Sequence, residues 1–97
     1  MSDVPEVLDP TIHAPGRLAI ISALSECEVA DFNFLIAATG LSRGNFSIHM
    51  SKLVAAKYVE EKKHFVGRKP RTDYRLTLRG AEAFKNYKLA WRRITGA

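Results

Sequence analysis

Apolar positions divide this chain into four stretches of helical spacing and one of alternation. The helical stretches, in which apolar residues recur every three or four positions, are residues 16–26, 31–39, 43–56 and 78–95. Between the last two, apolar and polar residues alternate, which predicts a hairpin of strands 58–65 and 72–78 around a Gly/Pro turn at 66–71. Residues 1–10 carry two prolines and three acids without periodicity, so we expect an extended arm ahead of a domain at 11–97.

Residues that favour helix ends stand at the borders of these stretches. Pro15 suits the first turn of the first helix, and Asp31 is a good N-cap for the second. Gly40 is a typical C-terminal stop, and Ser42, two positions later, is the N-cap of the third helix. Two helices separated by such a short turn with glycine predict a helix-turn-helix. Thr77 is the expected N-cap of the last helix.

The third helix has two different faces. Phe46, Met50 and Leu53 form an apolar stripe, with His49 beside it. The opposite face is small and hydroxyl-bearing and contains no acid; its residues are Gly44, Ser47, Ile48, Ser51, Lys52 and Ala55. A face that is merely solvated more often carries Glu–Lys pairs. Small residues allow close approach to a groove, hydroxyls reach phosphates and bases, and an apolar side chain can meet a thymine methyl group.

Charge is distributed unevenly along the chain. Residues 1–41 have a net charge of −5 and residues 42–97 of +10, which together give the +5 of the whole chain. A basic half suggests a polyanionic partner. Arg68, Lys69 and Arg71 cluster at the predicted hairpin turn. Such a cluster is often only a soluble turn, but a narrow minor groove attracts arginine, and the neighbouring helix-turn-helix favours DNA contact.

The first and last helices have apolar arcs wider than one stripe. A helix that is apolar on more than one side usually packs against two neighbours, of which one can be a second subunit. We therefore expect a homodimer whose interface includes Leu18, Ile21, Leu24, Tyr87, Trp91 and Ile94.

Other chemistry is not indicated. The chain has no glycine-rich phosphate loop and no nucleophile motif, so we expect no enzyme. His13, His49 and His64 share no helix at ligand spacing, and Cys27 is the only thiol, so neither a metal nor another cofactor is expected. Cys27 lies between two glutamates, and we expect it to be an inert, apolar side chain without a redox role.

Membrane insertion is not indicated either. No apolar run approaches the ~20 residues of a membrane span, and the acidic N-terminus is unlike a signal peptide. We expect a cytoplasmic protein, associated with the nucleoid when bound to DNA.

Three motifs resemble a known family. They are the S-x-H-M-x-x-L segment at 47–53, the GRKPRT turn at 67–72 and the Y-x-LT-x-x-G segment at 74–80. In this combination and order, the segment 18–84 resembles the winged-helix domains of MarR-like and ArsR-like transcriptional regulators, in their small single-domain branch. One position departs from the pattern, because Lys57 stands where a glycine is common after the recognition helix.

The resemblance implies a mainly α fold with a small β-hairpin wing, in a homodimeric regulator that binds double-stranded DNA and acts as a repressor. Helix 42–56 would enter the major groove, and the wing at 66–72 would reach the minor groove or the backbone. The implied contacts are Ser42, Arg43, Asn45, Ser47, Ile48, Ser51, Lys52, Arg68, Lys69, Arg71 and Thr72. An effector, if one exists, would bind at the dimer interface. The alternatives are a module that binds protein or RNA and a chromosome-binding protein without sequence preference.

Overall fold

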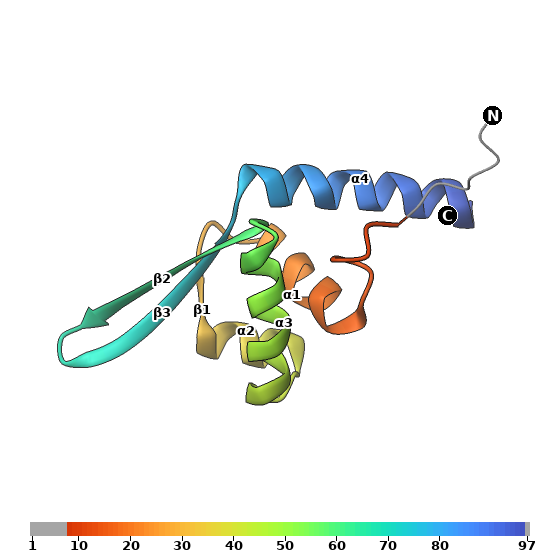
Figure 1. The fold of residues 1–97 in the computed structure, drawn as a ribbon. Helices are drawn as coiled ribbons and strands as arrows, with labels where there is room; N and C mark the ends of the chain where they lie inside the picture. Colours follow the sequence, from red (N-terminus) through yellow and green to blue (C-terminus); the bar gives the residue numbers. More distant parts are fainter. Residues whose placement is uncertain (1–7, 97) are drawn as a thin grey trace.

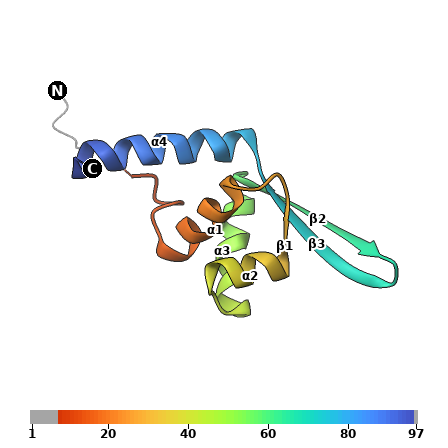
Figure 2. The ribbon, with the colours of Figure 1, turned by 180° about the vertical axis from the view of Figure 1, so that it is seen from behind.

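Four helices and three strands follow one another in the computed structural model, which describes residues 8–96 (Figure 1). In chain order they are α1 (Pro15–Ser25), β1 (Ala30–Asp31), α2 (Phe32–Thr39), α3 (Arg43–Ala55), β2 (Val59–Val66), β3 (Lys69–Leu76) and α4 (Leu78–Thr95). Helices α1 to α3 lie together, α4 crosses one end of this group, and the β2–β3 hairpin extends away from it (Figures 1 and 2). The predicted mainly α fold with a β-hairpin wing is confirmed.

The predicted caps account for three of the helix starts. The Asp31 carboxylate accepts a hydrogen bond from the Phe34 backbone N–H at 2.7 Å, and Ser42 Oγ accepts one from Asn45 at 3.2 Å. Thr77 Oγ1 accepts one from Gly80 at 2.9 Å. Each bond satisfies a backbone donor that has no partner within its helix. Gly40 ends α2 in the left-handed conformation with φ 71°, as its position predicts.

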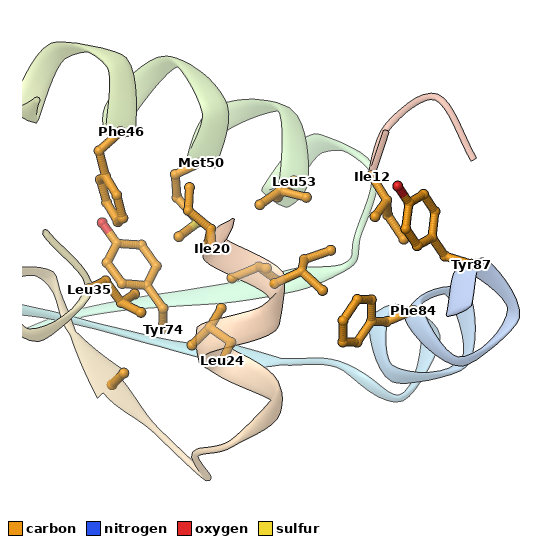
Figure 3. Packing of buried hydrophobic residues seen from close by; sticks show 13 residues of the cluster. Ile12, Ile20, Leu24, Leu35, Phe46, Met50, Leu53, Tyr74, Phe84 and Tyr87 are labelled. Atoms are coloured by element: carbon orange, nitrogen blue, oxygen red, sulfur yellow. The ribbon is translucent and has the colours of Figure 1, made fainter. Parts of the chain in front are cut away.

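The core lies where α1, α3 and α4 meet the base of the sheet (Figure 3). Ile20, Leu24 and Leu35 are fully buried, as are Phe46 and Leu53 on the predicted stripe of α3. The rings of Phe32 and Tyr74 pack edge-on against Phe46, with centroids 5.1 and 5.8 Å away. These contacts set the rotation of α3 and leave its other face outside the core.

The segment before α1 packs against the domain. Ile12 is fully buried, Tyr58 donates its hydroxyl to Asp9 at 2.5 Å, and His13 Nδ1 lies 2.9 Å from the Tyr87 hydroxyl. The sequence predicts an extended arm at 1–10, of which residues 1–7 lie outside the described residues. Residues 8–10 lead into a turn, and these side chains connect the segment by hydrogen bonds to the α3–β2 connection and to α4.

The sheet is antiparallel with the strand order β1–β3–β2. Strands β2 and β3 pair from Val59↔Leu76 to Val66↔Lys69, which leaves a turn of only Gly67 and Arg68. The predicted turn at 66–71 is therefore too long, because Lys69 to Arg71 belong to β3. Gly67, at φ 65°, supplies the left-handed conformation that this tight turn requires.

The junction between α3, β2 and α4 explains the Y-x-LT-x-x-G motif. Thr77 donates its hydroxyl to the Lys57 carbonyl at 2.7 Å and its N–H to the Tyr58 carbonyl at 3.0 Å. A Cβ at Gly80 would overlap the Tyr58 carbonyl oxygen, so α4 can approach the Tyr58 backbone this closely only with glycine there. Lys57 has φ 66°, and it is the only non-glycine with positive φ among the described residues. The glycine common at this position in the resembling family would adopt that conformation more easily.

Candidate nucleic-acid interface

The outer face of α3 is exposed along its whole length. Ile48 is 59% exposed, and Lys52 beside it is exposed as well. Every residue predicted to contact DNA from this helix and its cap is exposed: Ser42, Arg43, Asn45, Ser47, Ile48, Ser51 and Lys52.

A groove separates the start of α2 and α3 from the wing. Its volume is about 490 Å³, and it is lined by Asp31, Phe32, Asn33, Arg43, Val66, Lys69, Pro70, Arg71 and Thr72. The fold thus brings Arg43 of the recognition helix to the same groove as three predicted wing contacts, Lys69, Arg71 and Thr72. The Arg43 guanidinium lies over the Phe32 ring, 4.8 Å from its centroid, and this cation–π contact orients the charge.

The three wing cations have different surroundings. Arg68 and Lys69 are exposed at the tip. Arg71, by contrast, lies between two carboxylates: its Nη2 is 3.1 Å from Asp31 Oδ2 and its Nε is 3.2 Å from Asp73 Oδ1. The sequence predicts a DNA contact for Arg71, whereas in the structure its charge is compensated within the protein.

Asp73 connects this pair to the other wing strand. His64 Nε2 on β2 lies 2.7 Å from Asp73 Oδ2. The hydrogen bond to His64, and then the bond to Arg71, lower the pKa of Asp73. This network was not predicted from the sequence. Its only local signal is the spacing of Arg71 and Asp73, two positions apart on one face of a strand.

The residues predicted for a dimer interface fall into two groups. Ile21 and Leu24 are fully buried in their own chain and Tyr87 is 5% exposed, so these three side chains offer little free surface to a second subunit. The wide apolar arc of α1 arises because α2, α3, β3 and α4 all pack against this helix. Trp91 and Ile94 are 44% and 51% exposed, and Leu18 is partly exposed.

A second groove lies beside these exposed residues, between α1 and α4. Its volume is about 420 Å³, and Leu18, Ser22, Phe84, Tyr87, Lys88, Trp91 and Arg92 line it. We call it the α1–α4 groove.

The histidines are engaged at separate places. His49 Nδ1 is 3.3 Å from Arg17 Nη1, and its ring lies against Gly16. Burial lowers the pKa of His49, and the charges of Arg17 and Lys52 lower it further.

Across residues 8–96, no three His, Cys, Asp or Glu side chains come together as metal ligands would. None of the helices in this range has the length and apolar character needed to cross a membrane.

The fold and the exposed basic surface define a winged-helix DNA-binding protein. The chain belongs to the winged helix DNA-binding domain family, whose model matches residues 17–95. The chain is 35% identical over 71 residues to an uncharacterized protein from Methanocaldococcus jannaschii, across 73% of this chain and 77% of that one. Membership in this family agrees with the expectation that the chain is a DNA-binding regulator and not an enzyme.

Solved structures agree with this assignment. A transcriptional regulator homologue from Pyrococcus horikoshii OT3 superimposes with a TM-score of 0.81 at 26% identity, covering 87% of this chain and 83% of that one. A MarR-family transcriptional regulator from Silicibacter pomeroyi shares the fold, with a TM-score of 0.58 at 16% identity, over 84% of this chain and 56% of its own. The predicted winged helix-turn-helix fold is thereby confirmed.

Proposed function

We propose that the protein is a homodimeric transcriptional repressor that binds a specific double-stranded DNA operator in the cytoplasm. The observation that carries the proposal is the joint surface of α3 and the wing. Arg43 of α3 and Lys69 of the wing line the same groove. The acid-free face around Ile48 is exposed on α3, and Arg68 is exposed next to Lys69 in the wing turn. A helix fits the major groove of B-DNA, and a hairpin beside it reaches the next minor groove or the backbone.

Two sets of residues on this surface have different roles in the proposed DNA binding. Asn45, Ser47 and Ser51 are uncharged and exposed on α3, so they add discrimination between bases with little electrostatic contribution. Arg68 and Lys69 supply charge that neutralises phosphates regardless of sequence. A domain with both kinds of contact recognises a sequence, and one with charge alone binds any duplex.

The proposed dimer uses the exposed part of the apolar stripe on α4. Phe84 and Tyr87 cover the domain core, and the stripe continues to Trp91 and Ile94, which stay half-exposed beside the α1–α4 groove. A second copy that covers this surface would place two recognition helices on one duplex, as an inverted-repeat operator requires.

Binding to duplexes at increasing salt tests the proposed function. Selection from a randomised duplex pool should recover a preferred sequence, and log affinity should fall steeply with log salt concentration. A steep slope without a preferred sequence would instead assign the protein to non-specific chromosome binding. No duplex binding at moderate salt would reject the proposal in favour of a protein- or RNA-binding module.

A further inference from the structure

Two large apolar side chains are exposed at the tip of the wing. Phe65 is 70% and Val66 53% exposed, and they are the last residues of β2 before the Gly67–Arg68 turn. Strand β1 covers β3 only at Asp73 and Tyr74, so the outer part of the hairpin extends as a two-stranded ribbon beyond the core (Figure 2). Phe65 therefore contributes nothing to the core of its own chain.

The surroundings of Phe65 indicate its partner. Its cross-strand neighbour is Pro70, and Lys63, Arg68 and Lys69 are exposed around it. Exposed edge strands usually carry charge or proline, whereas Phe65 and Val66 together present two adjacent apolar side chains at the end of β2. An apolar tip surrounded by cations matches a minor groove, whose phosphate rims meet the cations while the apolar group faces the bases.

Two side-chain contacts connect the wing to its surroundings. The Asp31–Arg71 pair, with 3.1 Å between Oδ2 and Nη2, joins β3 to the cap of α2. The His64–Asp73 contact of 2.7 Å joins the two wing strands. Both contacts lie on the domain side of the tip, so they help to position the hairpin while leaving Phe65 exposed.

We propose that Phe65 is an apolar wedge that the wing inserts between two base pairs from the minor groove, so that the protein bends its operator. This inference rests on the proposed function and adds DNA bending to it. Partial unstacking costs least at pyrimidine–purine steps such as TA, because these steps are the most easily kinked. Phe65 then selects a flexible step by its deformability, without reading a base edge.

The test uses the full chain and the duplex recovered by selection. Dyes at the two ends of the duplex report bending by energy transfer, and 2-aminopurine placed at successive positions reports unstacking. The variants are Phe65→Ala, Phe65→Leu and Phe34→Ala. Phe34 is a matched control because it is 51% exposed on α2, outside the wing.

Wild-type protein should raise energy transfer and brighten 2-aminopurine at one step on each side of the operator. Phe65→Ala should abolish both signals, weaken binding by roughly 5- to 100-fold and leave the salt slope unchanged, because no charge is lost. Phe65→Leu should retain most of the wild-type bending and unstacking signals, and Phe34→Ala should retain all of them. Replacing a TA step under the wing by AA should weaken DNA binding by the wild-type protein much more than DNA binding by the Phe65→Ala variant.

Different failures have different meanings. A wild-type complex that binds the selected duplex without bending or unstacking overturns the wedge and leaves the proposed function intact. The same holds if Phe65→Ala binds and bends like wild type, or if Phe34→Ala has the same effect as Phe65→Ala. Absence of any duplex binding by wild type rejects the proposed function itself, and the wedge with it.

Discussion

Arg71 and Asp31 form an ion pair between the wing and the start of α2, with 3.1 Å between Nη2 and Oδ2. The other oxygen of Asp31 accepts the N-cap hydrogen bond from Phe34 at 2.7 Å, so one carboxylate holds both the helix and the wing. Half-exposed ion pairs contribute little to stability, about 0–1 kcal/mol each. This pair matters for position, because it joins the hairpin to the start of α2, which lines the same groove as Arg43 of α3.

We predict that Arg71→Gln weakens operator binding without changing its salt dependence. The charge of Arg71 is already compensated by two carboxylates, so its loss removes no phosphate contact but lets the wing move. Arg68→Ala is the contrasting variant and should reduce the slope of log affinity against log salt by about one. Asp31→Asn keeps an N-cap but breaks the ion pair, and should behave like Arg71→Gln. Equal slope losses in Arg71→Gln and Arg68→Ala would show that Arg71 does contact phosphate.

Ile48 should matter for recognition and not for folding. Because it is 59% exposed, Ile48→Ala should leave the free energy of unfolding nearly unchanged. It should weaken binding to the preferred duplex by ~1–3 kcal/mol through a lost base contact. Leu53→Ala, on the buried side of the same helix, should instead lower stability by ~2–5 kcal/mol. Thermal melts beside binding curves measure both effects, and equal affinities of Ile48→Ala and wild type would contradict the assignment.

If the protein forms the proposed homodimer, light scattering should give a mass of about twice the 10.8 kDa of one chain. Trp91 is the only tryptophan and lies half-exposed beside the α1–α4 groove, so its fluorescence should change when the dimer dissociates on dilution. Trp91→Ala should raise the dissociation constant of the dimer by roughly 30-fold, as for a central interface aromatic. Leu89→Ala removes another exposed apolar residue of α4 that does not line this groove, and should have little effect. A monomer at micromolar concentration would contradict the proposed assembly.

Stability should fall on acidification because of His49. Burial and the nearby Arg17 and Lys52 lower the pKa of His49 below its ordinary value of 6.5. The unfolded chain therefore binds a proton on His49 more readily than the folded chain does. The resulting loss of stability begins as the pH falls below 6.5 and is complete below the folded-state pKa. His49→Gln, which cannot take a proton, should show a flatter dependence of melting temperature on pH in this range. Asp73, with its lowered pKa, adds a separate loss only below pH 3.8.

The local features of this fold were predictable from sequence because they depend on residues close along the chain. The caps at Asp31, Ser42 and Thr77 each bond a backbone N–H three positions later. The exposed face of α3 follows from helical periodicity alone, so Ile48 was found without the structure. The sequence by itself therefore determined the order of the four helices and the hairpin, the helix-turn-helix and the side of α3 that stays out of the core.

Only the tertiary structure decided which apolar residues remain exposed for contact with another molecule, and which charged side chains are not paired within the protein. The apolar arcs of α1 and α4 look alike in sequence. Ile21 is nevertheless enclosed by its own chain, because α1 has neighbours on several sides. Trp91 is half-exposed, because the apolar stripe of α4 continues beyond the part of the helix that the domain covers. Arg71 appears in sequence as one more wing cation. Its partner Asp31 lies 40 positions earlier, and only the pairing of β1 with β3 brings the two side chains together, since helical and strand periodicity carry no information about distant contacts.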